Sequence, residues 1–150
     1  FRAAPTALDR AAAMAAVLAD SPTDDDVRMV VAALKGDQER FPVLADTGAL
    51  ARLARPDLRH FWRDELEHPS GGRRAVAARA LAALPADPTD LARLAKKIDG
   101  RDEYAVVLAA IDALAKLDPE GSKPVLERAA KQKSMNDVVG RAARRALGQR

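Results

Sequence analysis

Two histidines, His60 and His68, are the side chains of this sequence best suited to bind a metal ion or transfer a proton. Asp64 follows His60 at the spacing that puts two side chains on one face of a helix, and Glu67 comes soon after. The pattern lacks the His-Glu-x-x-His order of zinc hydrolases and a third ligand from another segment. We therefore interpret these residues as surface or packing residues and predict no metal site.

Two other polar segments could bind a phosphate or act as acids and bases. The glycine-rich segment at residues 70–74 (SGGRR) precedes an expected helix, whose N-terminus could hold a phosphate. It lacks the lysine of a P-loop and follows a helix rather than a strand, so we interpret it as a connecting loop. Asp24, Asp25 and Asp26 fall in the first turn of another expected helix, where they complement its dipole without an acid or base role. We predict no catalytic and no cofactor-binding residue.

The aromatic residues are few. Phe61 and Trp62 are adjacent, so on a helix their side chains point about 100° apart, and we expect one in the core and the other capping a groove. A platform for stacking nucleic-acid bases would need several aromatics interleaved with arginine, and Tyr104 is more than thirty residues away. We interpret the pair as core.

Composition indicates a soluble folded protein, with 31% charged and 48% hydrophobic residues, and its 150 residues fit a single domain, 1–150. Aromatics are only 3%, so Ala, Leu and Val must form the core, which favours closely stacked helix pairs. The chain has no cysteine and no apolar run of the ~18–20 residues that a membrane span needs, and nothing in it resembles a signal peptide. Because it begins with Phe1, we expect a piece of a longer protein. Composition leaves the compartment open, cytoplasmic or exported.

The net charge of +3 is unevenly placed, and the C-terminal part is basic. A basic surface of this kind can meet nucleic acid or an acidic protein surface, although most are simply solvated faces. We therefore expect a protein partner rather than nucleic acid. The candidate interaction surface consists of Lys131, Arg141, Arg144 and Arg145.

An internal repeat organises the chain. Leucines recur at intervals of 31 to 33 residues, at Leu18, Leu50, Leu81, Leu114 and Leu147. Prolines recur in phase with them at intervals of 31 to 34 residues, at Pro22, Pro56, Pro88 and Pro119. Residues 21–24 (SPTD) and 87–90 (DPTD) have the same form: a cap, a proline at the first helical position and a carboxylate two residues later.

Each period predicts a pair of helices, so we expect roughly nine helices and no strand. In the helix at residues 103–117, one buried stripe is expected from Val107, Ala110, Ile111, Leu114 and Leu117, and alanines at 105, 109 and 113 form a second apolar face. The other helices are expected at residues 7–19, 23–35, 42–54, 56–67, 73–84, 88–98, 123–131 and 137–147. The fold class is therefore all-α. The period predicts an α-solenoid of about four to five HEAT-like pairs, because tetratricopeptide and ankyrin signatures are missing.

Particular residues carry a resemblance to a known family. Residues 134–139 (SMNDVV), 141–143 (RAA) and 146–148 (ALG) resemble the closing HEAT repeat in the C-terminal region of bacterial zinc aminopeptidases of the membrane-alanyl-aminopeptidase family. Residues 103–106 (EYAV) and 113–114 (AL) resemble the repeat before it, and residues 8–12 (LDRAA) the start of the same region. The resemblance implies a helical domain that packs on catalytic domains and shapes substrate access. The HExxH and GxMEN motifs of that family are absent from this sequence, so it implies no catalytic residue or cofactor here.

Three functions compete. The first is a non-catalytic HEAT-like domain, the C-terminal part of a zinc aminopeptidase. The second is an independent scaffold that binds a protein partner along its concave face. The third is a HEAT-like DNA-binding or repair enzyme, which would need convergent acidic and aromatic side chains that this sequence barely offers.

Overall fold

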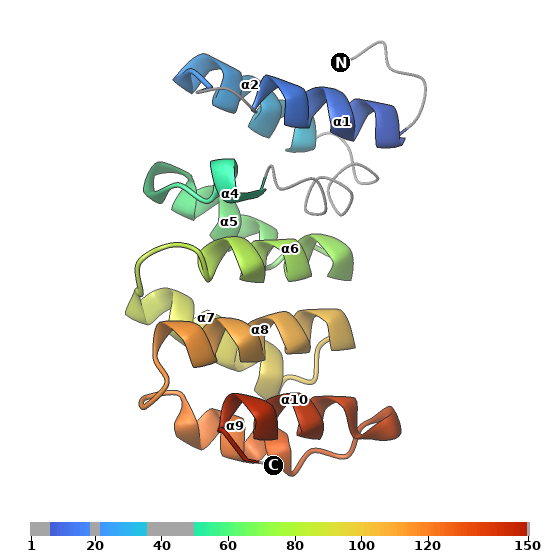
Figure 1. Ribbon diagram of the computed structural model, residues 1–150, viewed down its shortest axis with the longest axis vertical. Coiled ribbons are helices and arrows are strands. Elements are labelled where there is room, and N and C mark those ends of the chain that lie inside the picture. The colour runs from blue at the N-terminus through green and yellow to red at the C-terminus, as the bar shows by residue number, and fades with distance from the viewer. Residues whose placement is uncertain (1–6, 19–21, 36–49, 150) are drawn as a thin grey trace. The chain divides into compact units, whose positions relative to one another are not determined.

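The computed structural model describes residues 7–18, 22–35 and 50–149, and every regular element in these ranges is a helix (Figure 1). The all-α prediction is therefore confirmed for this part of the chain. The α-helices are α1 (Ala7–Val17), α2 (Asp24–Lys35), α4 (Leu50–Leu53), α5 (Arg59–Glu65), α6 (Gly71–Leu81), α7 (Pro88–Asp99), α8 (Tyr104–Leu117), α9 (Lys123–Ala130) and α10 (Val138–Ala146). Two 3₁₀ helices, η1 (Pro56–Leu58) and η2 (Met135–Asp137), precede α5 and α10. The helix expected at residues 42–54 is seen only from residue 50 onward, because its start lies outside the described residues.

The chain divides into two compact units, residues 1–58 and 59–150. The single domain expected from length stays a prediction. In the first unit, α2 buries Val27, Val30 and Leu34 at the spacing of one helix face. Arg55 donates a 2.7 Å hydrogen bond to Asp24 at the start of that helix. The negative charge of Asp24 is therefore balanced by an arginine of the same unit. None of the described helices is both long enough and apolar enough to cross a bilayer.

The two proline-containing helix starts differ. At α7, the carboxylate of Asp87 accepts hydrogen bonds from the amides of Thr89 and Asp90 at 2.8 and 3.4 Å, with Pro88 following the cap as predicted. At α2, the predicted placement of Pro22 inside the helix is wrong. Thr23 is the cap: its amide donates to Asp26, whose own amide donates back to the Thr23 hydroxyl. These reciprocal bonds satisfy two backbone amides, those of Thr23 and Asp26. A proline could not take part in such a pair of bonds, because it has no amide hydrogen.

Helix α8 lies at the centre of the second unit and packs against α6, α7 and α10. Figure 1 shows α6, α8 and α10 following one another in a layer, with α7 and α9 beside α8 and α10. The predicted stripe is buried from Val107 to Leu114, where its residues are at most 1% exposed, but Leu117 at its end is only half-buried. The second apolar face is also buried, but it begins at Val106, because Ala105 is exposed. Both apolar faces of α8 are therefore covered by other helices, as the sequence predicts.

The repeated leucines are not equally buried. Leu81 and Leu114 are fully buried, whereas Leu147 follows the last residue of α10 and is half-buried. We predict that Leu114→Ala lowers the free energy of unfolding by ~2–5 kcal/mol, as for other buried leucines, and that Leu147→Ala costs less. Thermal melts of the two variants check this. Equal costs, or a larger cost at Leu147, would contradict the assignment.

A buried ion pair joins α5 to α6. Glu65 and Arg73 are only 5% and 2% exposed, and the guanidinium of Arg73 donates two hydrogen bonds to the Glu65 carboxylate, at 2.6 and 2.7 Å. Two parallel bonds of this kind fix the relative orientation of their helices. The pair therefore sets the register of α5 against α6.

We predict that Glu65→Gln lowers the free energy of unfolding by ~3–5 kcal/mol, because Arg73 would keep a buried charge without its counter-charge. The double variant Glu65→Met/Arg73→Met should cost clearly less than Glu65→Gln alone, since both charges leave together. Urea unfolding with matched slopes gives the comparison. A double variant less stable than Glu65→Gln would show that the pair stabilises beyond its burial cost.

Candidate interaction surface

The four basic residues of the predicted interaction surface do not form one patch. Lys131 and Arg144 line a hollow between α9 and α10, together with Glu127 and Leu147. Arg145 lines a different hollow, against Asp112 and Lys116 of α8. Arg141 is exposed on α10 and lines neither.

Arg144 is also partly engaged inside the unit. Its guanidinium pairs with the carboxylate of Asp137 and donates a 3.2 Å hydrogen bond to the carbonyl oxygen of Ala130. Arg144 thus ties the start of α10 to the end of α9, which leaves fewer of its donors for a partner. The other three side chains are the exposed cations of the set.

The two histidines lie in different settings. His60 is exposed on α5, whereas His68 is half-buried and its Nδ1 accepts a 3.0 Å hydrogen bond from the amide of Ser70. Across the described ranges, no three His, Asp or Glu side chains converge where they could hold a metal ion. The local role of His68 is to shape the turn before α6.

The glycine-rich segment is an interhelical contact. Arg73 pairs with Glu65, and Arg74 donates to Asp102 at 2.5 Å and to Glu103 at 3.2 Å. A methyl group placed on Gly71 would lie 2.1 Å from a carboxylate oxygen of Glu103, so this glycine permits the close approach of an internal acid. The N-terminus of α6 already faces carboxylates of the protein, which argues against a bound phosphate.

Phe61 and Trp62 are both buried, at 7% and 1% exposure, with ring centroids 4.8 Å apart. The prediction that one of them caps a groove is wrong. Their helix packs against α6, and Arg59 and Arg63 on it bond to Asp90 of α7. Neighbours therefore cover α5 on two sides, enough to bury two side chains that point about 100° apart.

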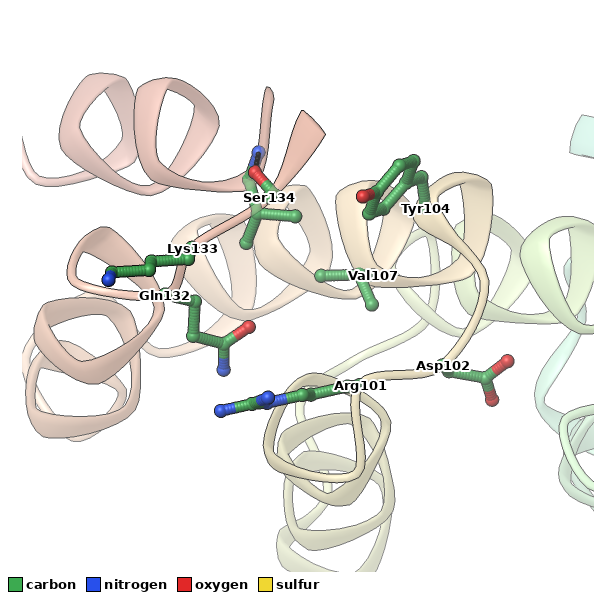
Figure 2. A pocket seen from close by; sticks show the side chains of 8 residues that line it. Arg101, Asp102, Tyr104, Val107, Gln132, Lys133 and Ser134 are labelled. Atoms are coloured by element: carbon green, nitrogen blue, oxygen red, sulfur yellow. Dashed lines mark hydrogen bonds between the residues drawn. The ribbon is translucent and has the colours of Figure 1, made fainter. Parts of the chain in front are cut away.

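A further hollow, which the sequence does not predict, lies where α7 ends and α8 begins (Figure 2). Val107 and Val139, both at most 3% exposed, form its apolar part. Figure 2 shows Arg101 along one edge and Tyr104 and Ser134 along the other. The remaining lining residues are Asp102, Gln132 and Lys133. Its volume of about 210 Å³ suits a single side chain better than a drug-sized ligand, which needs roughly 300–1,000 Å³.

Most polar groups of this hollow already have one partner. The Tyr104 hydroxyl accepts a 3.0 Å bond from the amide of Met135, and the Ser134 hydroxyl accepts a 3.1 Å bond from that of Val139. Gln132 donates a 3.2 Å bond to the carbonyl oxygen of Ile98. In contrast, the side chains of Arg101 and Lys133 form no ion pair with any residue in the described ranges.

The carboxylate of Asp102, which lines this hollow, is neutralised by groups that lie outside the hollow. Burial would raise the pKa of Asp102, but hydrogen bonds from Arg74 and the Glu103 amide, with the charges of Arg74 and Lys97, outweigh it and hold the pKa below its usual value. Asp102 therefore stays ionised and paired within the unit. The cations of the hollow remain without a counter-charge there.

Arg101 has a backbone conformation that favours glycine. Its φ is +54°, and it follows α7 in a C-terminal motif in which the Arg101 amide donates to Ile98 and the Asp102 amide to Lys97. The same two bonds close α10, where Gly148 takes the equivalent position with φ +68°. Gly100, which caps α7, precedes the left-handed position by one residue and has a right-handed backbone with φ −74°.

One exposed large hydrophobic side chain, Tyr104, lines this hollow. In the described parts of the chain, Met29, Tyr104 and Met135 are the large hydrophobics with high exposure, at 43%, 45% and 70%. Met135 follows the lining residue Ser134, and its backbone amide forms the hydrogen bond to Tyr104 given above. The sequence signal that could have drawn attention to this place is a positively charged residue directly after Gly100, at the end of an expected helix.

Comparison of the chain with protein-family models, with curated proteins and with solved structures found no match.

We predict that Arg101→Gly raises the free energy of unfolding by ~1 kcal/mol, because glycine adopts the left-handed conformation without the cost that a side chain incurs. The reciprocal variant Gly148→Ala should lower it by a similar amount. Chemical denaturation of both variants measures the effects. A destabilised Arg101→Gly would mean that the arginine side chain stabilises the fold by more than its backbone costs.

Proposed function

We propose that this chain is a non-catalytic HEAT-like α-solenoid that binds polypeptide surfaces. The observation that carries the proposal is a sequence offset of 28 to 31 residues that recurs among the polar contacts of the second unit. Arg59 bonds to a residue 31 positions later, Arg74 to one 28 later and Glu67 to one 30 later. Asp99 and Arg128 lie 29 positions apart, and Tyr104 and Met135 lie 31 apart.

An offset of one period is what a repeat stack requires. In such a stack each repeat contacts its sequence neighbours, so equivalent positions face one another along the stack. The leucine and proline series have the same period, and the helix contacts of α6 with α8 and of α8 with α10 join every second helix. These observations support about four to five stacked pairs over the whole chain.

The polypeptide in question is proposed to be the rest of a larger zinc aminopeptidase. This step rests on the resemblance of residues 103–106 and 134–148 to the C-terminal repeats of that family. In this role the module packs on catalytic domains and shapes substrate access, and it supplies no catalytic residue.

The second candidate is an independent scaffold for a separate protein partner. It is favoured by the exposed side chains of Tyr104 and Met135 and by the guanidinium of Arg101, which is unpaired within the described ranges, since tyrosine, methionine and arginine are enriched at protein interfaces. The coding sequence upstream of Phe1 separates the candidates. An open frame that continues into an HExxH motif selects the aminopeptidase domain, and a frame without one selects the scaffold.

We predict that the purified chain holds no stoichiometric zinc and does not hydrolyse aminoacyl anilides. Catalytic zinc needs three protein ligands, an open position and a general base, and His60 and His68 lie in separate environments. Elemental analysis and an anilide assay on the wild type and on His60→Ala/His68→Ala test this. One equivalent of zinc, with activity that the double variant loses, would refute the non-catalytic proposal.

A further inference from the structure

The hollow between the end of α7 and the start of α10 has an excess of unused hydrogen-bond donors. The hydroxyl oxygens of Tyr104 and Ser134 each accept a bond from a backbone amide, so their O–H groups remain to donate elsewhere. Arg101 adds a guanidinium that has no ion-pair partner within the described ranges. A hollow with spare donors and a net positive charge suits an anionic acceptor.

The acceptors of the hollow are fewer. The Asp102 carboxylate already accepts hydrogen bonds from Arg74 and the amide of Glu103 and forms an ion pair with Lys97. Gln132 keeps its side-chain carbonyl oxygen, because only its NH₂ group is bonded, to Ile98. Figure 2 shows the Arg101 guanidinium below this amide, whereas the Lys133 ammonium points away and contributes through its charge. A planar guanidinium binds carboxylates, like phosphates, with two parallel bonds.

The exposed ring of Tyr104 limits the ligand further. Val107 and Val139 line the hollow but are at most 3% exposed, whereas Tyr104 is 45% exposed. A small inorganic anion would leave this ring uncovered. A carboxylate on a short aliphatic stem, with an apolar neighbour, would cover it.

The backbone at Arg101 does not require an arginine side chain. The two equivalent helix ends, at α7 and α10, make the same pair of hydrogen bonds, with Arg101 at the left-handed position of one and Gly148 at that of the other. Glycine can therefore replace Arg101 without disturbing the helix end.

We propose that this hollow binds the carboxylate of an acidic residue in a partner polypeptide, with Arg101 as the counter-ion, Tyr104 and Ser134 as hydroxyl donors, and Tyr104 and Met135 as contacts for an adjoining apolar residue. That the carboxylate belongs to a polypeptide rests on the proposed function. The carboxylate site itself does not depend on it.

The test is a ¹⁵N-NMR titration of the full chain with short peptides. The probe is acetyl-leucyl-glutamyl amide, and acetyl-leucyl-glutaminyl amide is its uncharged match. We expect saturable shifts of the amides of Tyr104, Met135 and Val139 with the first peptide, with a Kd on the order of 1 mM, and at least ~10-fold weaker binding of the second. Acetyl-leucyl-glutamine with a free C-terminal carboxylate shows whether a chain end is accepted as well as a side chain. Tighter binding of the glutamyl peptide than of its uncharged match supports the proposal, whereas binding of the chain-end carboxylate alone would overturn the choice of an acidic side chain.

Arg101→Gly is the decisive variant, because it should fold at least as stably as the wild type while its affinity for the glutamyl peptide falls ~10-fold or more. Arg79→Ala is the matched control: Arg79 is exposed on α6, and its loss changes the net charge equally, so its affinity should stay within about two-fold of wild type. Unchanged binding in Arg101→Gly, equal loss in Arg79→Ala, or equal shifts with the glutaminyl peptide would overturn the proposal. Inorganic phosphate that shifts the same amides more tightly than the glutamyl peptide would overturn the choice of a carboxylate.

The result is separable from the proposed function. Zinc-dependent activity of the chain would refute the non-catalytic module and leave a carboxylate site at Arg101 standing. Failure of all three peptides would remove this site and leave the repeat scaffold to bind through another surface.

Discussion

Close packing of small side chains around α8 is the constraint on which the second unit depends. Ala109, Ala110 and Ala113 are buried on this helix, and the facing helix α6 buries four alanines of its own. Alanine is the strongest helix former and lets helix backbones approach closely, but each contact buries little area. Stability must therefore come from many such contacts. The larger buried side chains Leu114, Leu81 and Trp62 add to them.

Surfaces of alanine are smooth, so they fix the distance between two helices better than their register. Polar contacts complement them. Glu65 with Arg73 joins α5 to α6, and the buried Asp90 at the start of α7 accepts bonds from both Arg59 and Arg63 of α5. A displaced register would leave these charges buried without partners, which costs far more than a displaced alanine. We infer that the ion pairs select one alignment among several that the apolar faces would tolerate.

The helices could be predicted from the sequence because each follows a local pattern. The stripe of Val107, Ile111 and Leu114, and the capping motif at Asp87, depend on residues within one or two turns. Predictions failed where the outcome depends on a neighbouring element. The cap at Thr23 replaced the predicted one through a reciprocal bond with Asp26, and Phe61 and Trp62 are both buried because two helices cover α5.

The candidate site was harder to predict for the same reason. Charge density alone singled out Lys131, Arg141, Arg144 and Arg145, but the structure divides them between different hollows and engages Arg144 with Asp137. The hollow at Arg101 draws its lining from the loop after α7, from α8, from the segment before α10 and from α10 itself. No spacing within one segment of the sequence could indicate that these residues meet.

The polar contacts within residues 59–150 that link different helices join residues at most 34 positions apart, and most span 24 to 31. The entropy lost in closing a loop rises slowly with its length, and folding rates fall as contacting residues lie farther apart in sequence. Such a chain can form each contact from a segment of about one period, without first bringing its distant ends together. It should therefore fold rapidly and be able to start at more than one place along its length, a kinetic property that follows from where its ion pairs fall.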